Sequence, residues 1–417
     1  MTKLKCLPLA LGILFMSSCA KENPSSDPCT NPSNSETIAV SEAIQSLENV
    51  IKMTTLTKSS LTRQFSCEDV IAIGKASLHT STKAQGDITI PDTLMYLVNF
   101  DKNQGFAIMS ATTKLREDVY CITESGSLSV SDIISAFQFI STQQDIQNSE
   151  NNNIIESGIQ IIPSIILSSM LYDLKYGKQD EEYSTKATGA TYGPYILTKW
   201  GQAHGIWNKY TPNNYAAGCV AIATSQIMLY NRLPIDPIFD GKQCNWKDME
   251  QVYNYYNFHQ GLELAGTLEQ QDQVGHFVYE IGKRHNCYIR YGEDGSGGWA
   301  DGAKRTLNNY GYSNVKKFLG FGKKNQKKAD ECLRQGYPVY LDGTGNGSGH
   351  AWVIDGLMND SFYHINWGWE GAGDGYYTKG VFNTTDRQSI DAMIDSGDVA
   401  VNQHNYTWNY RLITYSK

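Results

Sequence analysis

The sequence predicts an α+β protein built in two parts, and three observations lead to this fold class. Helical segments with an apolar face and short alternating strands are mixed along the chain. With 417 residues, the chain has the length of two to three domains. A polar segment at 179–191 separates a first part without obvious chemistry from a second part dense in Tyr, Trp and Gly. The formal net charge of −8 and the lack of a basic stripe argue against a nucleic-acid partner.

The N-terminus has the pattern of an export signal. Lys3 and Lys5 precede an apolar stretch at 7–15 that is too short to span a bilayer. Met16-Ser17-Ser18-Cys19 follows and resembles a bacterial lipobox, although Leu or Ile is usual where Met16 stands. This predicts a signal peptide at 1–19, lipidation of Cys19 and a membrane anchor, with a flexible tether at 20–35. An ordinary signal peptide remains the alternative.

Residues 36–178 form the first predicted part, a compact α+β unit. The central prediction is a hairpin of strands 94–100 and 105–110, joined by a turn at 101–104. The other expected elements are helices at 36–52, 67–76, 132–142 and 154–176, the last broken at Pro163, and a strand at 119–123. By itself, this unit is interpreted as a binding or folding module.

The segment 179–191 is polar and rich in Gly, Thr and Glu, which predicts an exposed linker that is open to proteolysis. We place the expected cleavage at Lys186–Ala187, with Lys178 as another candidate. The second part then occupies residues 192–417.

A helix beginning at Cys219 is the main feature of this second part. Apolar residues recur at Val220, Ala223, Ile227 and Tyr230, and Pro234 prevents much extension. A thiol at a helix N-terminus lies at the positive end of the dipole, which favours thiolate and lowers its pKa. A buried structural cysteine is the alternative interpretation of this stretch alone.

His350 follows a glycine-rich loop and opens a predicted hairpin. The loop at 343–349 has too many glycines for regular structure, and strands at 350–356 and 362–369 are joined by a turn at 359–361. This pairing brings Asn366 and Trp367 towards His350. Helices are expected at 244–249, 274–286, 301–310 and 327–335, with a strand at 337–341.

These residues compose a candidate nucleophilic site. Cys219 is the expected nucleophile, His350 the base, Asn366 the group that orients the imidazole, and Gln202 an oxyanion donor. His364 and His204 are rival bases. A zinc site from His350, His364 and Asp355 or Asp374 is less favoured, because HExxH and CxxC spacings are absent. A serine hydrolase would need a G-x-S-x-G elbow, which is also absent. No metal or cofactor is therefore expected.

Three segments together resemble the streptopain family of papain-like bacterial cysteine peptidases. They are Ala217–Ala221 running into Gln226-Ile227-Met228, Gly349–Gly356, and Phe362–Trp369 with Asp374-Gly375-Tyr376-Tyr377. The segments 96–100 and 105–110 resemble the family's inhibitory pro-region. The resemblance implies a two-lobed peptidase, with a helical lobe carrying Cys219 and an antiparallel sheet lobe carrying His350. A small α+β pro-domain would precede it.

The same resemblance implies roles for further residues. Gln202 matches the oxyanion glutamine and Trp367 the tryptophan beside the histidine, while Ser296 and Gly349 would line the substrate cleft. Family members favour an apolar residue at the second position before the scissile bond. The predicted function is an exported cysteine endopeptidase made as a zymogen and anchored at the outer membrane or cell surface, from which maturation would release it. Alternatives are a cell-wall peptide hydrolase and a non-catalytic surface-binding lipoprotein.

Overall fold

The structure is a computed structural model that describes nine segments of the chain. These are residues 36–55, 65–78, 88–141, 161–177, 190–202, 205–257, 261–345, 348–382 and 409–417. The predicted signal peptide with Cys19, the tether, Lys178, the Lys186–Ala187 cleavage site and His204 lie outside the described residues.

The first part contains the predicted β-hairpin with helices packed around it. Its elements are α1 (Val40–Thr55), η1 (Cys67–Asp69), β1 (Val70–Ile73), β2 (Met95–Asn99), η2 (Asp101–Asn103), β3 (Phe106–Ser110), β4 (Val119–Thr123), α2 (Val130–Ser141) and α3 (Ile161–Tyr176). The helix expected at 67–76 is wrong. Its β-branched residues instead form β1, which pairs with β2 in the register Val70↔Val98. Pro163 does not break α3, because it lies in the first turn, where no backbone N–H is needed.

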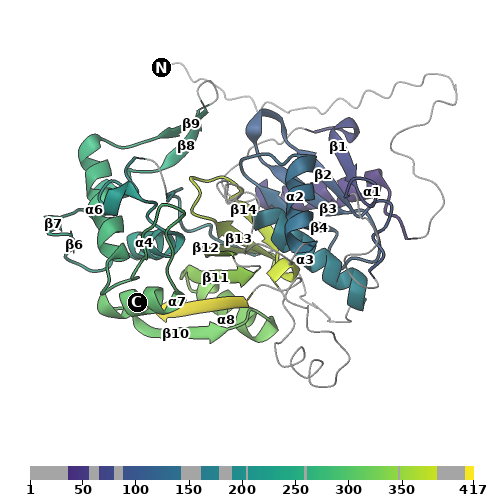
Figure 1. The fold of residues 1–417 in the computed structure, drawn as a ribbon. Helices are drawn as coiled ribbons and strands as arrows, with labels where there is room; N and C mark the ends of the chain where they lie inside the picture. The colour runs from purple at the N-terminus through teal and green to yellow at the C-terminus, as the bar shows by residue number, and fades with distance from the viewer. Residues whose placement is uncertain are drawn as a thin grey trace, which may run out of the picture.

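A helical lobe follows, coloured teal in Figure 1. It contains η5 (Pro212–Asn214), α4 (Cys219–Asn231), β6 (Ile238–Phe239), β7 (Lys242–Gln243), α5 (Trp246–Met249), β8 (Asn254–Asn257), β9 (Gly261–Leu264), α6 (Leu268–Gly282) and α7 (Ala300–Asn309). The predicted helices are present with shifted ends. A capping box between Thr267 and Gln270 starts α6 earlier than its apolar periodicity indicated.

The sheet lobe contains β10 (Ser313–Leu319), α8 (Lys323–Arg334), β11 (Val339–Gly345), β12 (Ser348–Met358), β13 (Phe362–Asn366), β14 (Gly375–Thr378), η6 (Lys379–Phe382) and β15 (Asn409–Ser416). Here β5 (Thr191–Tyr192) pairs with β12. The irregular loop expected at 343–349 is wrong over its described residues. They extend β11 and β12, because partners on both sides of β11 satisfy its backbone.

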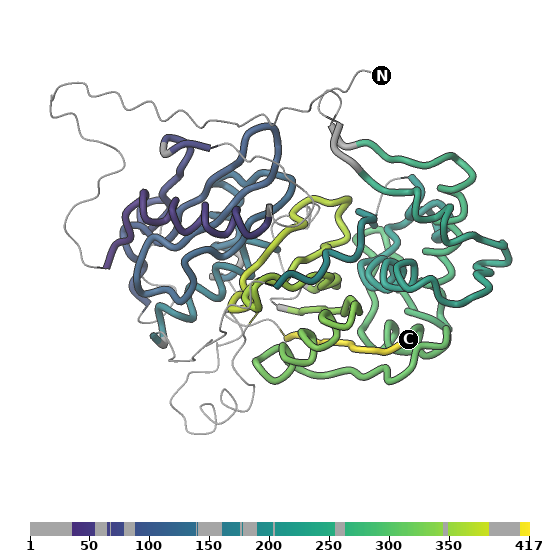
Figure 2. The backbone as a smooth tube through the Cα atoms, turned by 180° about the vertical axis from the view of Figure 1, so that it is seen from behind, coloured from purple at the N-terminus to yellow at the C-terminus, as the bar shows by residue number. Residues whose placement is uncertain are grey.

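One antiparallel sheet runs through both parts of the chain. Its order is β1-β2-β3-β4-β14-β13-β12-β11-β15-β10. The junction is the pairing of β4 with β14, in which Tyr376 lies opposite Ile122. Figures 1 and 2 show the first part and the helical lobe on opposite sides of the strands β11–β14. The sequence predicted two separate units and did not indicate this continuous sheet.

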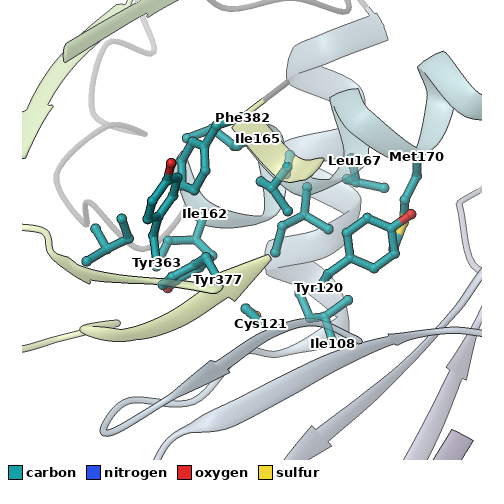
Figure 3. Close-up of a cluster of buried hydrophobic side chains, with 14 of the residues drawn as sticks. Ile108, Tyr120, Cys121, Ile162, Ile165, Leu167, Met170, Tyr363, Tyr377 and Phe382 are labelled. Atoms are coloured by element: carbon teal, nitrogen blue, oxygen red, sulfur yellow. The ribbon is translucent and has the colours of Figure 1, made fainter. Parts of the chain in front are cut away.

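The hydrophobic core also crosses the junction. Ile162 and Ile165 of α3 lie against Tyr377 and Phe382 of the sheet lobe, as Figure 3 shows. A second cluster fills the helical lobe around α4 and α6. The first part is therefore packed onto the second through apolar surface as well as through strand pairing. Among the described helices, none has the length and apolar character required to cross a membrane.

Candidate active site

Cys219 is the first residue of α4, as the sequence predicted. Gly218 precedes it with φ 87°, a conformation that disfavours any residue with a side chain. A Cβ on Gly218 would also lie 3.1 Å from the side chain of Ile289. The helix packs against β12, α6 and α7, which explains why nearly all of its residues are buried. These contacts fix the sulfur at the boundary between the two lobes.

The protonation of Cys219 differs from the expectation for a helix N-terminus. Burial raises the pKa of the thiol to about 11, and the charge of Asp342 acts in the same direction. The backbone N–H of Ala351 and those at the start of α4 oppose this shift. Desolvation therefore outweighs the dipole in this structure, and the group is a neutral thiol at pH 7.

His350 is held by a carbonyl group and by aromatic rings. Its Nε2 lies 2.8 Å from the carbonyl oxygen of Trp367. A carbonyl oxygen only accepts, so Nε2 carries the proton and Nδ1 keeps its lone pair. The ring stacks on Trp369 with centroids 4.4 Å apart, and Trp367 stacks on Trp369 in turn. Burial lowers the pKa of His350 to about 4, so the imidazole is neutral as well.

The two reactive groups lie near one another without being paired. The N–H of Ala351, the residue after His350, is the group of β12 that acts on the sulfur. Among the contacts of the described residues, there is no hydrogen bond or ion pair between the Cys219 sulfur and the His350 ring. The full chain therefore holds a neutral thiol and a neutral imidazole, not a thiolate–imidazolium pair.

Among the described residues, no hydrogen bond joins the Asn366 side chain to the His350 imidazole. The Asn366 Oδ1 accepts from Gln226 Nε2 at 2.9 Å and from the backbone N–H of Gly368 at 3.1 Å. Its amide donates to the Thr198 carbonyl at 2.9 Å. These bonds fix the backbone on both sides of Trp367, whose carbonyl meets His350. The orienting role expected of Asn366 stays a prediction, and the geometry favours an indirect one.

The other predicted site residues surround Cys219 from different segments. The carbonyl of Gln202 accepts from the Ala217 N–H at 2.7 Å, which places Gln202 beside the start of α4. The Ser296 carbonyl lies 3.4 Å from where a Cβ on Gly218 would stand. Ser296 Oγ is buried and has no hydrogen-bond partner among the described residues. Gly349 is exposed and pairs with Thr344 at the end of β12.

Comparisons with known proteins connect this geometry to a family. The model of the peptidase C10 family matches residues 200–377, which include Gln202, Cys219, His350 and Asn366. This matched segment, less than half of the chain, is similar to peptidases of the C10 family. The chain is similar to streptopain of Streptococcus pyogenes, with 29% identity over 196 residues that cover 40% of this chain and 46% of streptopain. The chain thus matches about half the length of these curated relatives.

Two further similarities extend the comparison. The thiol protease/hemagglutinin PrtT of Porphyromonas gingivalis is 25% identical over 182 residues, covering 40% of this chain and 20% of that protein. The fold resembles a fragment of prointerpain A from Prevotella intermedia, with a TM-score of 0.52 and 19% identity. That similarity covers 78% of this chain and 96% of the fragment, and it bears on the fold alone. The α+β class predicted from the sequence is confirmed.

His364, the other candidate base, has a different environment. Nδ1 of His364 lies 2.6 Å from Asp355, and its Nε2 lies 3.3 Å from Glu124 of the first part. Asp374 is engaged separately, because its Oδ1 accepts from the Trp367 N–H at 2.8 Å. In the described segments, no group of three or more His, Cys, Asp or Glu side chains could hold a metal ion.

The first part touches the loop that supports the His350 ring. Ser125 Oγ donates to the Gly371 carbonyl at 2.5 Å, and the Glu124 N–H donates to the Asp374 carbonyl at 2.7 Å. A Cβ on Gly373 would lie 2.4 Å from the Ile162 side chain, so α3 is in close contact with this loop. The loop follows Trp369, the residue on which His350 stacks.

Sequence reasoning missed three groups that contact the candidate site. Trp369 supports the histidine, but its sequence signal was weak, because the strand expected to run to Trp369 ends at Asn366 and the chain bends at Gly368, where φ is 74°. Asp342 could have been noticed, because it places a carboxylate directly after the apolar run Val339–Leu341. The backbone N–H of Ala351 had no sequence signal, because every residue except proline carries one.

Proposed function

We propose that this chain is the precursor of a cysteine endopeptidase of the C10 family. The main support is the position of Cys219 as the first residue of α4, a helix that packs against β12, the strand that carries His350. The carbonyl of Trp367 leaves Nδ1 of His350 as a proton acceptor, which is the form that a general base requires.

The proposed reaction proceeds through a thioester. The Cys219 sulfur attacks the peptide carbonyl carbon while its proton passes to Nδ1 of His350. The proton then goes to the leaving amine as the C–N bond breaks. Water adds to the thioester with His350 as base, and cleavage of the C–S bond restores the thiol. Gln202 and the Cys219 N–H would donate to the oxyanion, where one donor contributes about 3 kcal/mol.

We propose that the first part, residues 36–178, is an inhibitory pro-domain. It contacts the loop after Trp369, and the reactive pair in the full chain is neutral and unpaired. Cleavage in the linker 179–191, near Lys186–Ala187, would release these contacts and let the histidine and thiol form an ion pair. Residues 192–417 would then be the active peptidase.

Export and membrane anchoring belong to the proposal as well. The signal pattern before Cys19 supports a lipoprotein carried to the outer membrane or cell surface, and linker cleavage would free the peptidase. Its substrates would be proteins or peptides, and its own pro-domain would be its first partner.

The deciding experiment compares the full-length chain with its Cys219→Ala variant. We expect the wild-type chain to convert to a shorter form and to be labelled at Cys219 by an epoxide inhibitor of cysteine peptidases. Cys219→Ala should stay full-length and folded. N-terminal sequencing of the shorter form locates the cleavage site. Conversion of Cys219→Ala at the wild-type rate would refute the assignment.

The same experiment separates the alternative functions. A non-catalytic surface-binding lipoprotein would not react with the epoxide. A cell-wall peptide hydrolase would be labelled, but it would release peptides from cell-wall material and leave unfolded proteins intact.

A further inference from the structure

Three neighbouring strands place Ala351, Asp342 and Arg411 in one row. In the sheet register, Asp342 of β11 lies opposite both Ala351 of β12 and Arg411 of β15. Their neighbours at spacing two, including Tyr340, Val353 and Ile413, belong to the core of the helical lobe. Because side chains alternate along a strand, the row faces the helical lobe, where Cys219 lies.

Asp342 fixes Arg411 at the outer end of this row. The carboxylate is 4% exposed and accepts from Arg411 Nε at 2.6 Å and from the Tyr340 hydroxyl at 2.9 Å. Both carboxylate oxygens are thus used inside the protein. The Arg411 side chain is 20% exposed, and only its Nε has a hydrogen-bond partner among the described residues. The two terminal nitrogens remain available to a ligand.

Trp299, a residue of the helical lobe, lies beside Arg411 at the same end of the row. It is 58% exposed, which is unusual for so large an apolar ring, and the Arg411 guanidinium carbon lies 5.9 Å from its centroid. Trp299 directly follows the glycine loop at 295–298. That loop approaches the start of α4 through Gly298, where a Cβ would lie 3.5 Å from Val220. Trp299 and Arg411 therefore face each other across the two lobes, on the side where α4 begins.

We propose that Arg411, held by Asp342 and flanked by Trp299, binds an acidic side chain of the peptide substrate. This inference rests on the proposed peptidase function and deepens it by naming a substrate class. Adjacent strands are about 4.8 Å apart, so Arg411 lies two strands, about 10 Å, from Ala351. An extended peptide advances about 3.3 Å per residue, which places the acidic residue within three positions of the bond that is cleaved.

An acidic ligand fits better than a basic or an apolar one. A basic side chain would need Asp342, whose oxygens are buried and already bonded. An apolar side chain would cover the terminal N–H groups of Arg411 and leave them unsatisfied. The nearby Lys317 is paired with Asp301 at 2.6 Å, as Arg411 is with Asp342, so each positive charge in this region has a carboxylate partner. The attraction is therefore a directional hydrogen bond from guanidinium to carboxylate, not a general field.

The test uses the full-length chain after self-processing and peptides that carry Glu, Gln or Lys at each of three positions on either side of the cleaved bond. At one position, we expect kcat/KM for Glu to exceed that for Gln by about tenfold, with Lys lowest. The double variant Asp342→Asn, Arg411→Gln removes both charges together, so no carboxylate is left buried alone. We expect its Glu-to-Gln ratio to fall to about one; because the same thiol cleaves both peptides, this ratio cancels any effect that the lost Asp342 charge has on Cys219.

Two further variants test whether Arg411, and not a neighbouring charge, causes the preference. Asp342→Asn alone should retain or increase the preference for Glu, because Arg411 loses its internal counter-ion. Lys317→Gln, which removes a neighbouring positive charge that is already paired with Asp301, should leave the ratio unchanged. Cleavage without preference for Glu at any position, or an unchanged ratio in the double variant, would overturn this inference alone. Failure to cleave any peptide would overturn the proposed function and this inference with it.

Discussion

At the scale of single residues, burial decides the chemistry of the reactive pair. Desolvation raises the pKa of Cys219 to about 11 and lowers that of His350 to about 4, so both groups are neutral over most of the pH range between these values. The Trp367 carbonyl nevertheless keeps His350 in the tautomer that accepts a proton through Nδ1. In the full chain, the His350 ring thus has the tautomer that a base requires, but neither it nor the Cys219 thiol is charged.

Alkylation of Cys219 in the precursor should therefore depend steeply on pH. Only the thiolate reacts with iodoacetamide, and an acid with a raised pKa stays protonated to higher pH. We expect the rate at Cys219 to rise about tenfold per pH unit between pH 7 and 10. In the processed form, pairing with His350 should give fast alkylation at neutral pH. The measurement is brief labelling followed by mass spectrometry of the Cys219 peptide.

Cys244 provides an internal control for this experiment. Burial raises the pKa of its thiol to about 11 as well, and it lies away from His350 in the helical lobe. Its alkylation should show the same slope before and after processing. A precursor in which Cys219 reacts at a rate independent of pH between 6 and 9 would show that the thiolate–imidazolium pair already exists.

At the scale of elements, the pairing of β4 with β14 joins the two parts. The strands approach closely at Gly375, where a Cβ would lie 2.4 Å from the Ile122 carbonyl oxygen and 2.6 Å from the Thr123 Cα. Both neighbours are backbone atoms, so they cannot turn aside as a flexible side chain could. A glycine is required here by the close partner strand of the first part and by its own φ of 156°, which residues with a side chain rarely adopt.

Gly375→Ala should therefore destabilise the full chain through the β4–β14 junction, in addition to the strain at a positive φ. The added methyl group forces β4 away from β14, at a cost of about 1–3 kcal/mol. We expect faster self-processing and, in a Cys219→Ala background, a lower free energy of unfolding of the full chain by denaturant. Gly297→Ala is the control, because a Cβ there meets no atom within 4 Å. Equal stability of the two variants would contradict a tight β4–β14 junction.

At the scale of the whole molecule, a buried ion cluster links the two parts. Glu124 contacts Lys199 at 3.0 Å as well as His364, which also contacts Asp355. Burial alone would raise the pKa of Glu124, but the hydrogen bond and charge of His364, with those of Lys199, bring it well below its usual value. Burial alone would lower the pKa of His364, but Asp355 and Glu124 raise it well above its usual value.

The signs of these shifts define a pH window. The stabilisation from Glu124 is complete above its ordinary pKa of 4.5 and is lost as pH falls towards its lower folded value. That from His364 is complete below its ordinary pKa of 6.5 and is lost as pH rises through its higher folded value. Attachment of the first part should therefore be strongest between these two ordinary pKa values.

Glu124→Gln should remove much of this attachment. The substitution leaves Lys199 without its carboxylate and His364 with one partner, at a cost of about 1–3 kcal/mol. In a Cys219→Ala background, we expect the full chain to unfold at lower denaturant concentration near pH 5.5 and to lose part of its pH dependence. Glu36→Gln, which breaks an exposed pair with Lys114, should change stability by less than about 1 kcal/mol. A Glu124→Gln chain as stable as the wild type would exclude the cluster as a link.

The sequence by itself determined the elements and the chemistry that local patterns encode. The helix at Cys219, the hairpin 95–110 and the pairing of β12 with β13 follow from periodicity and turn residues, and the family motifs indicated the reactive groups. These features depend on neighbours in the chain, which explains why they could be predicted. Helix ends and the strand at Val70–Ile73 were missed, because partners elsewhere in the sheet decide them.

Only the tertiary structure decided which groups meet. It gave the orientation of His350 to the Trp367 carbonyl instead of the Asn366 side chain, and it placed His364 against Glu124 of the first part. It also set the protonation of Cys219, since desolvation depends on everything packed around the sulfur and a helix position reports only the dipole. Contacts between residues far apart in the chain leave no local pattern, so the continuous sheet and the row from Ala351 to Arg411 emerge only in three dimensions.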